Sequence, residues 1–207
     1  MAVDGSLLVP LYCTDDSGQK ALRHQCRDRI AAGAAVALSD GTTATVDGPF
    51  GARCGGGEVD PFPALIAKNA ARGSLWAIHP ASASDSVHAA PLPSAMTEPE
   101  AETARAFFVS RVQAKVELRA RLDDDDVPDA LIALQAPTAK RGHWIVPGAA
   151  SRTPSQVEAW RPGTRSRLAA TLETPQGLAL LLVRAKAWRL YTLRAGAYHL
   201  EGGWSCD

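Results

Sequence analysis

The segment 122–131 carries the residue types of this chain that are best suited to chemistry. Five aspartates fall within the seven positions 123–129. Carboxylates at this density repel one another unless solvent or a cation relieves their charge. Carboxylate oxygens are also the ligands that calcium takes up in proteins. The spacing therefore leaves two alternatives, a solvated acidic loop and a cation site.

The same segment resembles a known calcium-binding element. Its sequence, Leu-Asp-Asp-Asp-Asp-Val-Pro-Asp-Ala-Leu, is similar to the strand–loop–strand element of FG-GAP and VCBS-type repeats, whose loop typically reads D-x-D-G-D-G-x-P-D-L. In that family the loop binds calcium between two strands of a propeller blade, usually in exported proteins. The resemblance covers ten of the 207 residues. It implies that Asp123, Asp125 and Asp129 are calcium ligands.

The segment departs from the family pattern at three positions. Arg121 stands where the first carboxylate is expected, which removes a ligand and introduces a charge that repels the ion. Asp124 and Asp126 replace the two glycines, and aspartate adopts a positive φ less easily than glycine. The alternative to a calcium site is therefore an acidic hairpin loop that has kept its backbone shape and lost its ion.

Signatures of common enzyme classes are missing from the sequence. It contains no G-x-S-x-G, H-E-x-x-H, G-x-x-x-x-G-K-[ST] or G-x-G-x-x-G motif. The five histidines stand singly, and no spacing relates them to a serine and a carboxylate. We therefore assign no catalytic residue. A hydrolase whose site is assembled at the junction of the two halves of the chain is kept as an alternative, because ligand pockets often lie at such junctions.

The four cysteines are widely spread and contain no C-x-x-C pair, which excludes a zinc-ribbon or thioredoxin-type site. An even number at such spacing is typical of two disulfides. Of the three possible pairings we favour Cys13–Cys26, a local link, together with Cys54–Cys206, which would tie down the C-terminal tail. The alternative is four free buried thiols in a cytosolic protein.

Charge and hydropathy exclude two classes of partner. Lysine and arginine together number 22, as do aspartate and glutamate, so the surplus of positive charge that nucleic acid requires is absent. No run approaches the roughly 18 apolar residues of a membrane-spanning helix.

The N-terminal residues lack the pattern of a signal peptide. Disulfides indicate export, whereas the absence of a signal peptide argues against it. An exported protein, periplasmic or extracellular, whose signal peptide has been removed would account for both. A cytoplasmic location is the alternative.

Residues 1–80 are predicted to form a mixed α and β region. An amphipathic pattern over 16–33, with a capping Asp-Ser and a terminal glycine, predicts a first helix. Two apolar runs around an Asp-Gly turn predict a hairpin over 36–46. A second helix is expected over 60–72, where a proline follows an aspartate and a glycine ends the pattern. Residues 75–78 are typical of a short buried strand.

Residues 81–96, rich in proline, serine and alanine, are predicted to be a linker or surface loop. The next segment, 97–207, begins with Thr97 and Glu100, which are spaced as a capping box and indicate the start of a helix. Strict alternation of apolar and polar residues over 112–122 then predicts a strand with one solvent-facing side.

The remaining residues predict strands joined by short turns. The continuous apolar run 130–134 is typical of a strand covered on both faces. Further strands are expected at 143–146, 168–172, 178–183, 188–193 and 198–200. Residues 118–122 and 168–172 are similar and each is followed by an apolar strand, which indicates a possible two-fold hairpin repeat.

Together these patterns predict an α+β fold, with N-terminal helices and a small hairpin followed by a mostly antiparallel β-meander with blade-like hairpins. The function they favour is that of a non-enzymatic exported module that binds a protein or glycan partner, with a degenerate calcium site as a staple. A structural subunit of a larger assembly is a further alternative. The oligomeric state is left open by the sequence.

Overall fold

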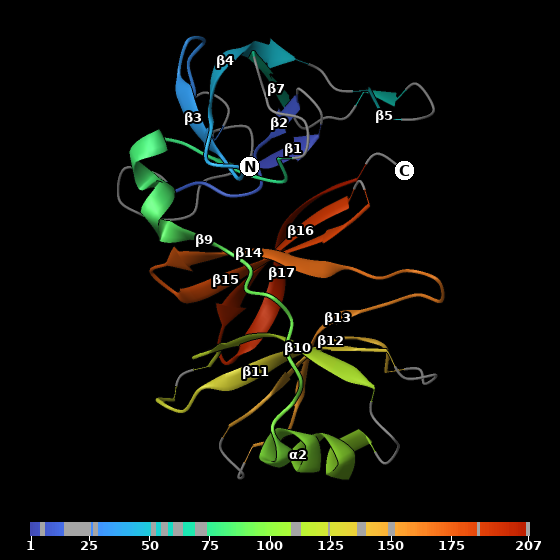
Figure 1. The fold of residues 1–207 in the computed structure, drawn as a ribbon. Helices are drawn as coiled ribbons and strands as arrows, with labels where there is room; N and C mark the ends of the chain where they lie inside the picture. Colours follow the sequence, from blue (N-terminus) through green and yellow to red (C-terminus); the bar gives the residue numbers. More distant parts are fainter. Residues whose placement is uncertain are drawn as a thin grey trace. The chain divides into compact units, whose positions relative to one another are not determined.

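The computed structural model (Figure 1) describes residues 1–4, 7–14, 26, 29–50, 53–54, 58–59, 64–68, 74–108, 113–123, 125–135, 140–148, 152–185 and 187–205. Just over half of these residues lie in strands. The chain divides into two compact units. Unit 1 comprises Met1–Ala89, Ala185–Leu190 and Leu200–Asp207, and unit 2 comprises Ala90–Arg184 and Tyr191–His199.

Unit 1 is built on a six-stranded antiparallel sheet with the order β1-β2-β7-β4-β3-β8. The strands are β1 (Ala2–Asp4), β2 (Leu7–Val9), β3 (Ala35–Leu38), β4 (Thr43–Phe50), β7 (Ala64–Lys68) and β8 (Ala77–Ile78). The strands β5 (Arg53–Cys54) and β6 (Glu58–Val59) pair with each other in a separate two-stranded sheet and lie between β4 and β7 along the chain. The predicted hairpin over 36–46 is confirmed by β3 and β4, and Asp40 accepts a hydrogen bond from the Thr42 amide in its turn.

The predicted α+β class with helices first is wrong, because the structure is β-rich and the elements described in its N-terminal region are strands. The second expected helix falls on β7, which pairs with β2 on one side and β4 on the other. A short apolar run such as Ala64–Lys68 suits a buried strand as well as a helix, and pairing on both edges satisfies its backbone donors and acceptors. The first expected helix falls almost wholly outside the described residues.

One of the two expected disulfides is present. Cys13 and Cys26 are bonded, with their Cα atoms 5.6 Å apart and Cys26 buried. The second expected pairing lies outside the described residues, since Cys206 and the Cys54 side chain are not among them.

Unit 2 contains the helix α2 (Glu98–Phe108) and a four-stranded antiparallel sheet with the order β10-β11-β12-β13. Its strands are β10 (Ala114–Ala120), β11 (Asp129–Leu134), β12 (Gly142–Val146) and β13 (Ser155–Ala159). The predicted capping box is confirmed, because the Thr97 amide donates to the Glu100 carboxylate at 2.6 Å. The sequence did not predict β13, whose short run of mixed residues carries no clear period.

A second, five-stranded sheet has the order β17-β16-β15-β14-β9. Its strands are β9 (Val87–Ala89), which follows the 3-10 helix Ala81–Ser86, and β14 (Arg167–Thr174), β15 (Gly177–Arg184), β16 (Ala187–Arg194) and β17 (Ala197–Ser205). The last four confirm the expected C-terminal strands, each joined to the next by a tight turn.

The four-stranded sheet of unit 2 is covered on both faces. One face packs on α2, where Phe108 and Trp144 stack edge to face at 5.0 Å. The other face packs on the second sheet through a cluster that includes Leu131, Ile145 and Leu180. All six residues of β11 are buried, which confirms the prediction from its apolar run.

A β-bulge changes which face of β10 is buried. Val116 pairs with Ile132 and Leu118 pairs with Leu131, so Glu117 is an extra residue in the strand. Val116 packs on the α2 side, whereas Leu118 packs in the cluster between the sheets. The strand was predicted, but its expected single solvent-facing side is wrong, since Glu117 is buried.

Candidate functional site

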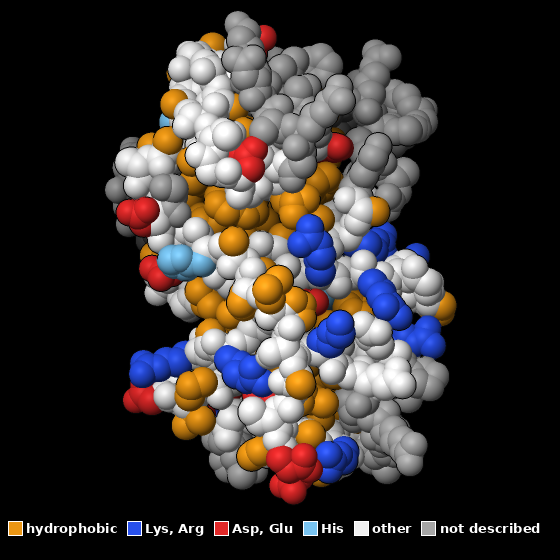
Figure 2. All heavy atoms as spheres, viewed as in Figure 1, with side chains coloured by type: hydrophobic (Ala, Val, Ile, Leu, Met, Phe, Trp, Pro, Cys, Tyr) orange, Lys and Arg blue, Asp and Glu red, His pale blue; other side chains and the backbone are white. Residues whose placement is uncertain are grey.

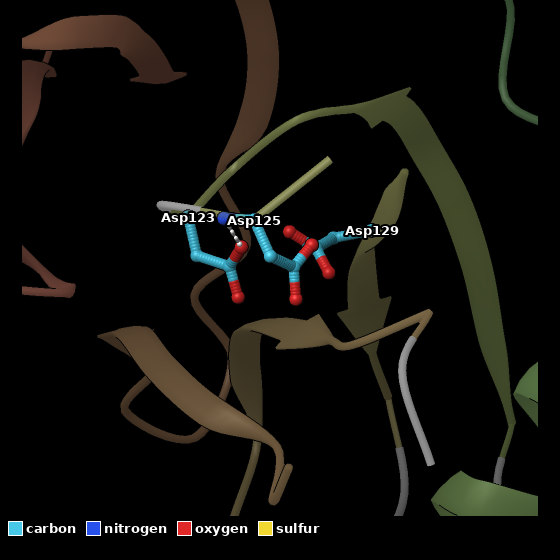
Figure 3. Close-up of side chains that lie close together, drawn as sticks. All are labelled: Asp123, Asp125 and Asp129. Carbon is cyan, nitrogen blue, oxygen red and sulfur yellow. Dashed lines mark hydrogen bonds between the residues drawn. The ribbon is translucent and has the colours of Figure 1, made fainter. Parts of the chain in front are cut away.

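The loop between β10 and β11 brings three carboxylates together (Figure 3). Leu122 is fully buried in the cluster between the sheets and anchors the start of the loop, and Asp129 is the first residue of β11. Asp123, Asp125 and Asp129 each place one oxygen so that the three atoms lie within 4.8 Å of one another. These three residues, called the aspartate cluster below, are those that the family resemblance singled out.

Local turns give the loop this shape. The Asp125 amide donates to Asp123 Oδ1 at 2.9 Å, and the Val127 amide donates to Asp125 Oδ1 at 2.8 Å. Aspartate side chains that bond to an amide two residues further on replace a backbone turn. Two such turns in succession direct the alternate aspartates to one side of the loop.

Asp129 is the buried member of the cluster. Only 1% of its surface is exposed, and its two oxygens accept hydrogen bonds from the amides of Leu122 at 3.1 Å and Gly148 at 3.2 Å. Burial raises the pKa of its carboxyl, and the charges of Asp123 and Asp125 add to this effect while the two amides oppose it. Asp129 therefore links the β10–β11 loop to the segment that follows β12.

Gly148 is needed for that link. A Cβ atom at this position would lie 2.3 Å from the Pro128 carbonyl oxygen, so any other residue would push the two segments apart. The close approach is what allows the Gly148 amide to reach Asp129.

Arg152 faces the two more exposed aspartates of the cluster. Its Nη1 donates a hydrogen bond to Asp123 Oδ2, and its Nε lies 3.5 Å from Asp125 Oδ2. The arginine side chain is 45% exposed, so it reaches the cluster from the solvent side. The guanidinium neutralises part of the negative charge that the three carboxylates concentrate.

Two other charged residues of the loop, Arg121 and Asp126, lie outside the cluster. Arg121, at the place of the family's first carboxylate, pairs with Asp126 at 3.0 Å, and both side chains are exposed. Asp124 is not among the described residues.

The aspartate cluster could hold a metal ion. Calcium binds oxygen at about 2.3–2.6 Å, so ligands on opposite sides of the ion are separated by roughly 4.6–5.2 Å. The three carboxylate oxygens of the aspartate cluster lie within 4.8 Å of one another, so none is too far from the others to bind the same ion. An all-oxygen donor set suits a hard cation rather than zinc. Three carboxylates supply only part of the six to eight ligands of calcium, so backbone carbonyls or water would complete the shell.

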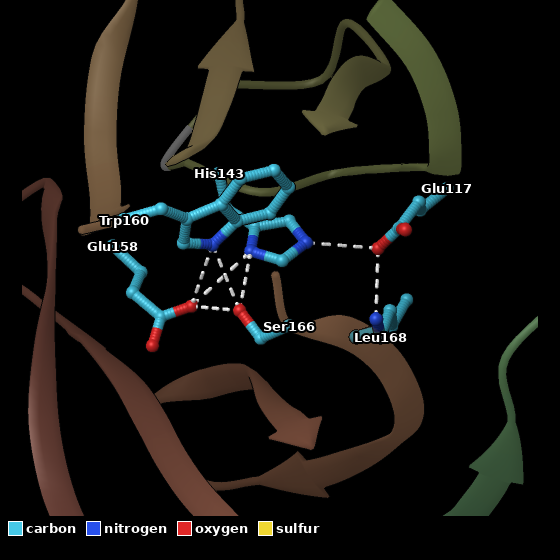
Figure 4. A network of polar contacts seen from close by, with 6 residues as sticks. All are labelled: Glu117, His143, Glu158, Trp160, Ser166 and Leu168. Carbon is cyan, nitrogen blue, oxygen red and sulfur yellow. Dashed lines mark hydrogen bonds and ion pairs between the residues drawn. The ribbon is translucent and has the colours of Figure 1, made fainter. Parts of the chain in front are cut away.

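A second cluster of ionisable groups lies between the four-stranded sheet of unit 2 and β14 of the second sheet (Figure 4). His143 of β12 is fully buried, with Nε2 at 2.9 Å from Glu117 Oε2 and Nδ1 at 3.4 Å from Glu158 Oε2. The Ser166 hydroxyl donates to Glu158 Oε2 and lies 3.5 Å from His143 Nδ1. The Trp160 indole donates to both Glu158 and Ser166.

The pKa values of this cluster shift in opposite directions. Burial alone would lower the pKa of His143, but hydrogen bonds and charges from Glu117 and Glu158 outweigh it and raise the pKa. Burial alone would raise the pKa of Glu158, but His143 and Ser166 outweigh it and lower that pKa. The geometry therefore favours a charged imidazole beside a charged carboxylate.

A serine, a histidine and a carboxylate at these distances share residue types with a hydrolytic triad. Ser166, His143 and both glutamates are all buried, and the serine hydroxyl is committed to Glu158 rather than directed at a position for a substrate. A substrate carbonyl would have to enter between the two sheets to reach Ser166. The arrangement is suited to holding the sheets together.

Sequence reasoning missed this second cluster. Its members come from positions as far apart as Glu117 and Ser166, so no spacing relates them. The signal that was present is His143 within an otherwise apolar strand, because a buried polar group needs a partner. Glu117 was expected on a solvent-facing side, and its burial depends on the bulge.

No helix among the described residues has both the length and the apolar character needed to cross a membrane. Comparison of the chain with protein-family models, with curated proteins and with solved structures gave no match in any of the three.

Proposed function

We propose that this protein is a non-enzymatic binding module in which calcium occupies the aspartate cluster and holds the β10–β11 loop in shape. The observation that carries the proposal is the convergence of Asp123, Asp125 and Asp129 from a single loop, with their oxygens within 4.8 Å. Their positions match the ligand positions of the loop that the sequence resembles, which supports calcium over other hard cations.

Arg152 takes the role of a competitor in this proposal. Calcium displaces its guanidinium from Asp123 and Asp125, and an arginine side chain that is nearly half exposed has room to move into solvent. The exchange replaces a single positive charge with a double one beside three carboxylates, which relieves more of their mutual repulsion. The same competition weakens the site, so we expect an affinity in the range of extracellular calcium modules, with a Kd of about 0.1–1 mM.

An exported location is part of the proposal. The Cys13–Cys26 disulfide supports an oxidising compartment, since such bonds are rare in the cytosol. A weak calcium site would be filled only where calcium is abundant, which is also outside the cell.

The partner in this proposal is a protein or a glycan. At the tip of the loop Val127 is 41% exposed beside the charged Asp126, which gives the ion-stabilised loop both apolar and polar contact groups. Lysine and arginine side chains are scattered over the face of unit 2 seen in Figure 2, interspersed with apolar and neutral groups. Such a surface favours a partner of mixed character over a polyanion.

Calcium-dependent thermal unfolding tests the proposal. A ligand that binds only the folded state stabilises it by about 0.4 kcal/mol when its concentration equals Kd and by about 2.7 kcal/mol at a hundredfold excess. We expect 10 mM calcium to raise the melting temperature and a chelator to reverse the effect. Asp125→Asn should abolish the shift, whereas the control Asp126→Asn, outside the cluster, should retain it.

The variant Arg152→Gln distinguishes two roles of Arg152, as a competitor that calcium displaces or as a permanent replacement for the ion. If Arg152 competes with the ion, the variant binds calcium more tightly and shows a larger melting shift than the wild type. If Arg152 has permanently taken the place of the ion, the variant is less stable and does not respond to calcium. The second outcome, together with no response of the wild type at 10 mM calcium, would overturn the calcium proposal.

A further inference from the structure

Three strands of the four-stranded sheet of unit 2 each direct an ionisable side chain toward the second sheet (Figure 4). Glu117 comes from β10, His143 from β12 and Glu158 from β13. All three are buried, and each nitrogen of the imidazole faces a carboxylate oxygen. We call these three residues the carboxylate–histidine clasp. It shares no residue with the aspartate cluster.

The number of N–H groups on the His143 ring determines whether it donates a hydrogen bond to both carboxylates of the clasp. A neutral imidazole has one N–H donor and one lone pair, whereas the imidazolium has two donors. With Glu117 Oε2 at Nε2 and Glu158 Oε2 at Nδ1, only the imidazolium donates to both carboxylates. Loss of its proton leaves one nitrogen lone pair facing a carboxylate oxygen and two buried carboxylates without a cation between them.

The clasp also reaches the second sheet. Glu117 Oε2 accepts a hydrogen bond from the Leu168 amide of β14 at 2.8 Å, in addition to its contact with His143. Ser166, which directly precedes β14, donates to Glu158. Both carboxylates therefore connect the four-stranded sheet to the start of β14, and the imidazole joins the two carboxylates.

The groups that face the imidazole come from several elements. The charged ones are Glu117 of β10 and Glu158 of β13. The connection between β13 and β14 contributes the neutral Ser166 hydroxyl and the Trp160 indole, whose ring centre lies 5.1 Å from that of the imidazole. Among these groups, the imidazole is the one that carries a positive charge when protonated.

We propose that the carboxylate–histidine clasp is a pH-sensitive lock between the four-stranded sheet of unit 2 and β14 of the second sheet, closed when His143 carries two protons and released when it loses one. The raised pKa of His143 means that its contribution to stability is complete below about pH 6.5, the value for an unfolded histidine, and is lost as pH rises through the folded-state pKa. The lowered pKa of Glu158 sets the acid limit, since its contribution is lost as pH falls through that pKa.

Nitrogen NMR of the full chain gives a direct test, because it reports protonation rather than stability. We expect His143 to show two protonated ring nitrogens at neutral pH and to titrate at a higher pH than an ordinary histidine. A His143 ring with a single protonated nitrogen at neutral pH would overturn the proposal, whatever the stability measurements show.

Urea unfolding between pH 5 and pH 9 provides the second test. Between the unfolded and folded pKa values of one linked proton, the equilibrium constant for folding falls by up to tenfold per pH unit. The wild type and the control His199→Gln should share this dependence, and Glu117→Gln should lose most of it. If the three profiles are parallel, the lock is excluded. His143→Gln is the stricter variant, and Glu117→Gln keeps the test valid if that variant does not fold.

Discussion

Two glycines in this protein allow segments that are distant in sequence to approach each other closely. Gly148 lets the chain after β12 reach Asp129, and Gly142 allows β12 to lie against β13 beside the carboxylate–histidine clasp. A Cβ atom on Gly142 would lie 1.8 Å from the carbonyl oxygen of Glu158, and the residue has a φ of 151°. Neither the contact nor the backbone conformation accommodates a side chain.

At this scale we predict that Gly142→Ala destabilises unit 2 by about 3 kcal/mol, because the added methyl group must displace the β13 backbone. Urea unfolding measures the loss. Gly163→Ala is the matched control, since Gly163 also has a positive φ, of 76°, but its Cβ would meet nothing within 4 Å. The control should cost only about 1 kcal/mol, the strain of a left-handed alanine. Equal losses in the two variants would show that the close approach has no consequence.

At the scale of elements, α2 is held to the four-stranded sheet by a polar contact at its start as well as by Phe108 and Trp144. Both oxygens of Glu100 pair with Arg119 of β10, at 2.7 and 2.9 Å, while the same carboxylate caps the helix at Thr97. Burial alone would raise the pKa of Glu100, but Arg119 and the Thr97 amide outweigh it and lower the pKa.

We predict that Glu100→Ala lowers the stability of unit 2 by about 1–3 kcal/mol at pH 7, since it removes a cap and a two-point contact with arginine. The pKa of Glu100 is lowered on folding, so its contribution is present at neutral pH and is lost as pH falls through the folded-state value. The two proteins should therefore converge in stability in urea titrations as the pH falls through that value. Glu98→Ala, which breaks the exposed pair with Arg105, is the control and should change stability by less than about 0.5 kcal/mol.

At the scale of the whole molecule, the two units are stabilised by different kinds of link. Unit 1 carries the Cys13–Cys26 disulfide, which joins positions 13 residues apart. Unit 2 carries the aspartate cluster and the carboxylate–histidine clasp, whose members are buried or linked to the backbone. The disulfide limits the unfolded state of unit 1, whereas the polar clusters act in the folded state of unit 2.

Reduction of the disulfide should therefore weaken unit 1 by about 3 kcal/mol, the value expected for closing a loop of this size. Hydrogen exchange with and without a reductant tests this, and amides of β3 and β4 should exchange faster after reduction. The Cys13→Ser, Cys26→Ser double variant should reproduce the effect without reductant. Non-reducing peptide mapping that finds both thiols free in the native protein would contradict the prediction.

The sequence by itself determined the features that depend on neighbours along the chain. Alternating and continuous apolar runs predicted the strands β10, β11 and β12 of unit 2, the Asp-Gly turn predicted the β3–β4 hairpin, and the Thr97–Glu100 spacing predicted the helix cap. The placement of Asp123 and Asp125 belongs with these, because two turns within one loop are enough to bring both carboxylates to one side. Each depends on contacts within a few residues, which a local pattern encodes.

Only the tertiary structure decided the features that depend on pairing. The Ala64–Lys68 segment is a strand because β2 and β4 flank it, although the same residues suit a helix. Glu117 is buried because a bulge against β11 turns it inward, and it meets His143 and Glu158 only once three strands are in register. Arg152 reaches the aspartate cluster from beyond β12 in the same way. A pattern of hydrophobicity records how a segment is buried, but it does not record which partner buries it.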